Sequence, residues 1–108
     1  MSYFVVIRDA GPGWTDGKGA FDQPEVDKHA AFMNTLETEG IVLFAGPLDG
    51  SEHGRIRALL IIKADSEADI RDRLLADPWA HTQRLVTTSI EPWHLLVGAD
   101  RLAAERVA

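Results

Sequence analysis

The chain has 108 residues, of which 45% are hydrophobic and 26% are charged, which suffices for one globular domain with its own core and excludes two. It contains no cysteine, which excludes disulfides, thiolate metal sites and a cysteine nucleophile. Its 17 acidic and 11 basic residues give a formal net charge of −6, which repels phosphate backbones and anionic lipid surfaces, so we expect neither nucleic acid nor a membrane as a partner.

The N-terminal residues show no basic region followed by a long apolar stretch, so we expect no secretion signal. The longest strongly apolar runs, such as residues 58–62, are far shorter than the ~20 residues of a membrane helix. We therefore expect a cytoplasmic protein.

The first half of the chain predicts a strand, a long loop and a helix. Residues 3–7 are aromatic and β-branched, which is typical of a strand. The glycine-rich segment 9–23 predicts a loop, and loops of this length are usually functional or mobile. Asp22 and Glu25 resemble a capping box, so we expect a helix to begin there and to end at Gly40.

Three further apolar segments predict strands: 41–45, 56–63 and 86–97. Ser66 and Asp69 predict the start of a second helix between the last two of them. We expect Pro78 to end that helix, because proline denies the next turn an amide. Since Pro92 cannot donate to a ladder, we place the last strand at a sheet edge or assign a bulge there.

This order of elements predicts an α+β fold of the ferredoxin-like type, βαββαβ, with two helices on one face of an antiparallel four-stranded sheet. We expect residues 1–97 to form this single domain and residues 98–108 to form a C-terminal tail. The other sheet face is too apolar to stay open to water, so we also expect a homodimer whose sheets pack face to face.

His29 is the candidate acid/base residue. At about 100° per residue it lies within roughly 40° of Met33, the centre of the apolar stripe of the first helix, so it faces the sheet. An imidazole there needs hydrogen-bond partners and is well suited to proton transfer. The same pattern also fits a hydrogen-bonded core histidine with no chemical role.

Asp77 is the partner that we propose for His29, because it stands where the second helix stops and can reach sideways instead of capping. A carboxylate on one imidazole nitrogen fixes the tautomer and raises the basicity of the other nitrogen, as a general base requires. The alternative is that Asp77 only forms a turn before Pro78, which is common for this dipeptide.

Three tryptophans stand next to turns or prolines: Trp14, Trp79 and Trp93. They are candidate pocket walls, although ordinary core or interface packing explains each of them as well. The remaining histidines lack the spacing of metal ligands: His53, His81 and His94. Because the glycine-rich loop also lacks a nucleotide-binding motif, we expect neither a metal nor another cofactor.

Several short motifs stand in an order and spacing similar to that of the YCII-related domain family, over about residues 3–97. They are the helix with His29 ahead of Gly40, Ala45-Gly46-Pro47, Asp77-Pro78-Trp79 and Ile90-Glu91-Pro92-Trp93. The resemblance implies a dimeric ferredoxin-like fold, related to muconolactone isomerase and other dimeric α/β-barrel proteins. It also implies an acid/base pair at the matching positions His29 and Asp77.

One branch of that family removes hydrogen chloride from chlorinated hydroxylated aromatics. The long loop 9–23 departs from the shorter members, which puts any substrate carried over from them in doubt. We expect a small-molecule enzyme of lyase or isomerase type, with a pocket shaped by Gly46, Pro47, Trp14, Trp79 and Trp93. The alternatives are a dimeric module that binds a metabolite without turnover and a structural dimer with a buried polar pair.

Overall fold

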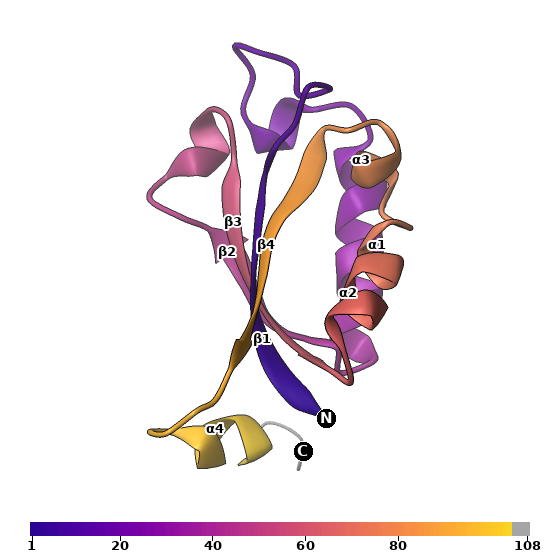
Figure 1. The fold of residues 1–108 in the computed structure, drawn as a ribbon. Helices are drawn as coiled ribbons and strands as arrows, with labels where there is room; N and C mark the ends of the chain where they lie inside the picture. The colour runs from indigo at the N-terminus through magenta and orange to yellow at the C-terminus, as the bar shows by residue number, and fades with distance from the viewer. Residues whose placement is uncertain (105–108) are drawn as a thin grey trace.

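The computed structural model describes residues 1–104, which form one antiparallel sheet with helices (Figure 1). The strands are β1 (Ser2–Ala10), β2 (Val42–Pro47), β3 (Arg57–Ala64) and β4 (Leu85–Trp93). The helices are α1 (Val26–Thr38), α2 (Glu67–Leu74), α3 (Pro78–His81) and α4 (Ala99–Ala104), with the 3-10 turns η1 (Ala20–Asp22) and η2 (Ser51–His53). Within these residues, no helix is long and apolar enough to cross a membrane.

The four strands lie in the order β2-β3-β1-β4, and every neighbouring pair is antiparallel. Helices α1, α2 and α3 all lie on one face of the sheet (Figure 1). This confirms the predicted ferredoxin-like α+β fold. Pro92 lies in β4, which is an edge strand, and the edge position is the one that tolerates a residue without an N–H.

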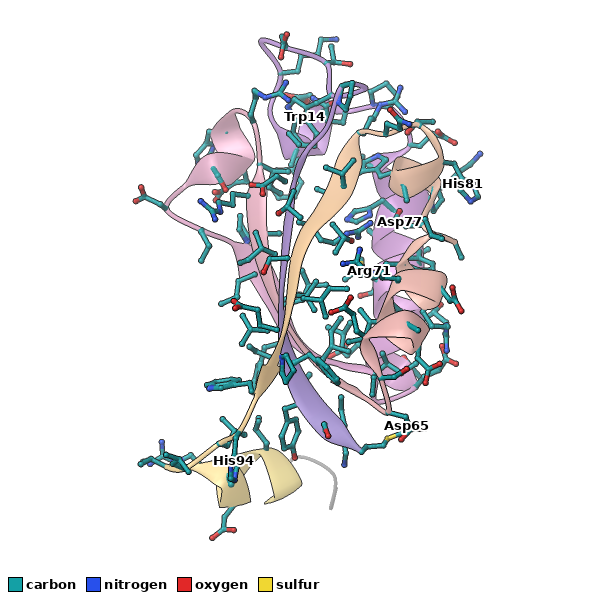
Figure 2. The ribbon with its side chains drawn as sticks, in the orientation of Figure 1. Trp14, Asp65, Arg71, Asp77, His81 and His94 are labelled. Carbon is teal, nitrogen blue, oxygen red and sulfur yellow. The ribbon has the colours of Figure 1, made fainter. Side chains whose placement is uncertain are left out.

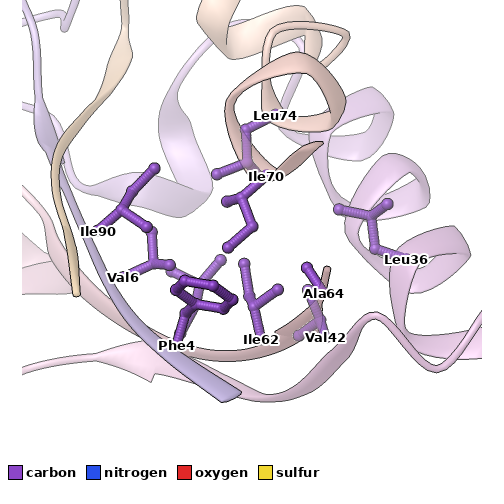
Figure 3. Close-up of a cluster of buried hydrophobic side chains, with 10 residues drawn as sticks. Phe4, Val6, Leu36, Val42, Ile62, Ala64, Ile70, Leu74 and Ile90 are labelled. Atoms are coloured by element: carbon purple, nitrogen blue, oxygen red, sulfur yellow. The ribbon is translucent and has the colours of Figure 1, made fainter. Parts of the chain in front are cut away.

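The core lies between the helices and the sheet (Figure 3). Its buried members are Phe4, Val6, Leu36, Val42, Leu60, Ile62, Ala64, Ile70, Leu74 and Ile90. Side chains of a strand alternate between its two faces, so Phe4 and Val6 of β1 place Arg8 on the same buried face. Arg8 is 1% exposed. A charge buried this deeply needs an ionic partner. We therefore expect an acidic side chain beside Arg8, at the end of the sheet near α3.

The start of α1 differs from the sequence prediction. The helix begins at Val26, and its N-cap Glu25 has a left-handed backbone (φ 63°) with no capping bond from its side chain. The predicted capping box of Asp22 and Glu25 is therefore wrong. The Nε1 group of Trp79 instead donates to the carbonyl of Pro24 at 2.8 Å, so a contact distant in sequence holds the chain where the helix begins.

The other helix signals are confirmed in part. Gly40 ends α1 with a positive φ of 78°, and the Ser66 hydroxyl accepts from the backbone of Asp69 at the start of α2. Pro78, however, does not end α2, which stops at Leu74. Pro78 opens α3 instead, because the first helical position has no partner for an N–H and tolerates proline well.

One glutamine, Gln23, makes three hydrogen bonds within the long segment after β1. Gln23 is 3% exposed, and its side chain bonds both backbone groups of Thr15 and the carbonyl of Lys18 at 2.8–3.0 Å. Trp14 of the same segment is buried in a second apolar cluster with Trp79. The segment is thus built into the fold beside α3.

The last predicted strand is shorter than expected, since β4 ends at Trp93 and not at residue 97. Residues 99–104 of the predicted tail form α4, and Leu102 in it is buried. Residues 105–108 of that tail lie outside the described residues.

Candidate active site

Asp77 forms the centre of a buried polar cluster and is 0% exposed. Its Oδ1 accepts from the backbone N–H of Trp79 at 2.9 Å, which caps α3. Its Oδ2 lies 2.8 Å from Nη1 of Arg8 and 2.8 Å from Nδ1 of His29. The carboxylate of Asp77 therefore caps α3 and also contacts Arg8 and His29. From the sequence we expected only one of these two roles.

The cluster joins three elements that are distant in sequence. Arg8 comes from β1, His29 from α1 and Asp77 from the N-terminus of α3. His29 faces the sheet, as its helical position predicts. Sequence reasoning missed Arg8, because it ended the first strand at residue 7. The signal was its spacing, because a residue two positions after Val6 lies on the same strand face as Phe4 and Val6.

The charges of the cluster balance locally. Burial lowers the pKa of Arg8 below its usual value, although the charge of Asp77 and the hydrogen bond to it oppose this. Burial would raise the pKa of Asp77, but the hydrogen bonds and charges of His29 and Arg8 outweigh it and hold that pKa below its usual value. Asp77 is thus ionised at neutral pH.

The ionised carboxylate sets the tautomer of His29. Because a carboxylate only accepts hydrogen bonds, Nδ1 of His29 carries the hydrogen that points at Asp77. In the neutral ring the other nitrogen, Nε2, is then an acceptor. Within residues 1–104 no hydrogen bond engages Nε2, and the imidazole is 17% exposed. Nε2 therefore keeps a lone pair that no described residue uses.

The lowered pKa of Asp77 predicts an acid-sensitive fold. Such a carboxylate stabilises the native state fully above its unfolded-state pKa of about 3.9, and the contribution is lost as the pH falls through the lower folded-state pKa. We expect the free energy of unfolding to fall more steeply below about pH 4 in the wild type than in Asp77→Asn. Urea unfolding at a series of pH values measures this. Parallel curves for the two proteins would contradict it.

Two tryptophans fix the imidazole ring. The ring of His29 stacks on Trp79 with centroids 4.0 Å apart and planes 5° apart, and Trp14 meets Trp79 edge to face at 5.6 Å. Trp79 is itself anchored, because its backbone N–H donates to Asp77 and its Nε1 donates to Pro24. The ring is thus held by a stacked face and by a hydrogen bond at Nδ1.

The structure does not bring the other predicted pocket residues to this cluster. Gly46 and Pro47 lie exposed on β2, at the far edge of the sheet from β4. Trp93 pairs with Tyr3 at the opposite end of β1 from Arg8 and is 41% exposed. Within one chain these three do not contact His29 or Asp77, and their assignment to a pocket stays a prediction.

The remaining histidines also lie apart from the cluster. Figure 2 shows His81 on the outer side of α3 and His94 at the other end of the molecule beside α4. His53 is exposed in η2. Among residues 1–104, no group of three potential metal ligands gathers in one place.

The chain is a ferredoxin-like α+β domain with a histidine–carboxylate pair between its helices and its sheet. No family model and no curated protein matches the sequence. Among solved structures, the chain is similar to 5-chloro-2-hydroxyhydroquinone dehydrochlorinase (TftG) from Burkholderia phenoliruptrix AC1100, solved in complex with 2,5-dihydroxybenzoquinone. The similarity covers 91% of this chain and 97% of that chain, with a TM-score of 0.56 and 18% identity. At this identity the likeness shows a shared fold.

Proposed function

We propose that this chain is a YCII-related small-molecule enzyme of lyase or isomerase type, with His29 as its general acid and base. The observation that supports this most directly is the 2.8 Å contact of Nδ1 with the buried Asp77. A carboxylate at that nitrogen orients the ring, sets its tautomer and stabilises the imidazolium that forms when Nε2 takes a proton. Asp77 acts as a positioning residue in this scheme.

Arg8 keeps the carboxylate of Asp77 ionised. Its full positive charge lies 2.8 Å from Oδ2 of Asp77, so the carboxylate stays ionised in a buried place. His29 then takes a proton from an acidic C–H or O–H of the substrate and returns it at another atom, or a leaving group departs with its bonding electrons and His29 releases the proton to water. The first outcome is an isomerisation and the second an elimination.

Hydroxylated aromatic compounds are the substrate class to test first. The structurally similar dehydrochlorinase acts on 5-chloro-2-hydroxyhydroquinone, and an elimination of hydrogen chloride needs a base such as the one proposed here.

The variant His29→Asn tests the proposal. Asparagine keeps a donor for Asp77 but has nothing in place of Nε2, so we expect turnover to fall about 10²–10⁴-fold with the fold intact. Chloride release from 5-chloro-2-hydroxyhydroquinone, and consumption of a panel of phenols and lactones, measure turnover. Circular dichroism checks the fold.

The matched control is His81→Asn, an exposed histidine on α3, which should keep full turnover. If His29→Asn turns over as fast as the wild type, His29 is not the acid/base residue. A wild type that binds a compound saturably, with no product over many equivalents, favours instead a dimeric binding module.

We also propose that the working unit is a homodimer formed through the open sheet face. The side chains on that face alternate with the core residues along each strand. The apolar ones are Tyr3, Val5, Ile7, Leu59 and Ile61 in the two central strands, with Phe44 and Trp93 at the edges, and the register also places Lys63, Ser89 and Glu91 on this face. Helices α1, α2 and α3 lie on the other side (Figure 1). A contiguous apolar patch of this kind marks an interface, and a second copy offers the same patch in a two-fold pairing.

Phe44→Lys tests this interface, because Phe44 is 51% exposed and its replacement leaves the core untouched. We expect this variant to be monomeric at concentrations where the wild type is dimeric. Sedimentation velocity measures the mass. Phe21→Lys is the control, since Phe21 is 78% exposed on η1 and away from the sheet face. A monomeric wild type, or a dimeric Phe44→Lys, would contradict the proposal.

A further inference from the structure

A hollow of about 410 Å³ lies between α2, α3 and β4, and Arg8, which contacts Asp77, is part of its lining. This volume is in the range of small-molecule sites. Its polar lining side chains are Arg8, Arg71, Gln83 and Thr87, and the rest of the lining is leucine, valine and alanine. The hollow therefore offers two guanidinium groups on an apolar wall and no lining carboxylate, although the whole chain carries a net charge of −6.

Arg8 lines this hollow and has a guanidinium nitrogen without a hydrogen-bond partner. Its contact with Asp77 uses Nη1, while its Nε is buried without any hydrogen-bond partner. Nε and Nη2 together form the edge of a guanidinium that binds a carboxylate with two parallel hydrogen bonds. A buried donor without a partner is unfavourable, and an oxyanion of a ligand would satisfy it.

Arg71 supplies the second cation. Figure 2 shows Arg71 and Asp77 on the same side of the sheet. The Nε of Arg71 pairs with Glu67 at 3.2 Å across one turn of α2, and both side chains are about half exposed. An exposed pair of this kind contributes little. The terminal nitrogens of Arg71 make no other hydrogen bond among residues 1–104, so they are available to a ligand.

We propose that this hollow binds a small organic anion, with Arg8 and Arg71 holding its carboxylate or phenolate group and the leucine and valine side chains holding its apolar body. The inference rests on the proposed function, since it names a substrate class for the site that Arg8 joins to Asp77. A ligand bound at Nε and Nη2 of Arg8 would share this guanidinium with Asp77, the carboxylate that orients His29. Arg8 thus links ligand binding to the acid/base pair.

Benzoate and benzamide test the charge requirement, because they have the same shape and only benzoate is an anion. Titration followed by ¹H–¹⁵N NMR, including the Nε–H signal of Arg8, measures both affinities. We expect benzoate to bind at least about tenfold more tightly, as for a charge-assisted bidentate contact, and to shift that signal. Added salt should weaken benzoate only.

The variant Arg71→Gln should weaken benzoate about tenfold and leave benzamide unchanged. Arg73→Gln is the matched control, because Arg73 is on the same helix, lies outside this hollow and pairs with Glu39. The proposal is overturned if benzoate fails to bind, if benzamide binds equally well, or if Arg73→Gln has the effect of Arg71→Gln. We test Arg71 and not Arg8, because loss of the buried Arg8 is expected to destabilise the fold.

Failure of this inference is distinct from failure of the proposed function. If His29→Asn loses turnover but benzoate does not bind, the anion site is wrong and the acid/base role stands. If benzoate binds as expected but His29→Asn keeps its turnover, the anion site stands and the acid/base role is wrong.

Discussion

Replacing Asp77 with asparagine is expected to destabilise the fold by about 3–5 kcal/mol, because it leaves the cation of Arg8 buried without a counter-charge. Arg8 is 1% and Asp77 0% exposed, so water cannot replace the lost carboxylate. The same variant leaves Nδ1 of His29 without its ionic acceptor, and we expect turnover to fall as well. Urea unfolding measures the stability, and the chloride assay measures the turnover.

A double-mutant cycle separates the buried pair from general damage. Arg8→Met in the Asp77→Asn background removes the stranded charge, so the double variant should be more stable than the sum of the two single effects predicts. Asp72→Asn, an exposed position on α2, should change stability by less than about 0.5 kcal/mol. Additive effects of Arg8 and Asp77 would contradict the account of a coupled pair.

Trp79→Ala is expected to destabilise the fold by about 3–5 kcal/mol, the usual range for removing a buried aromatic ring. Trp79 is 1% exposed and contacts Trp14, His29 and Pro24 at once. Its loss opens a cavity and also frees the imidazole ring. Urea unfolding measures the first effect, and ¹⁵N chemical shifts of the His29 ring measure the second.

The milder variant Trp79→Phe keeps a ring against His29 but loses the Nε1 hydrogen bond to Pro24. We expect it to lose less stability than Trp79→Ala and to keep the tautomer of His29. Phe21→Ala, at a residue that is 78% exposed, serves as the surface control and should change stability by less than about 0.5 kcal/mol. A Trp79→Ala variant as stable as that control would contradict the packing account.

Much of the fold is readable from local patterns. The order of strands and helices follows from apolar periodicity, and the edge position of β4 follows from Pro92, which has no N–H for a ladder. The inward orientation of His29 follows from its place near Met33 on the helix face. Gly40 and Ser66 mark helix ends through local backbone chemistry. These features depend on residues close together in the chain.

The boundaries and the site depended on contacts between distant residues. The start of α1 at Val26 goes with a hydrogen bond from Trp79 to Pro24, and not with a local capping box. Pro78 opens a helix because Asp77 caps it. No local rule distinguishes a proline that ends one helix from a proline that begins the next.

By itself, the sequence determined the class of fold and the two residues of the proposed acid/base pair, since both follow from patterns within single elements or from a resemblance to a family. Only the tertiary structure decided that Asp77 serves Arg8, His29 and the N-terminus of α3 together. The physical reason is that a buried charge needs partners, and folding alone determines which distant groups come within hydrogen-bonding distance of one carboxylate.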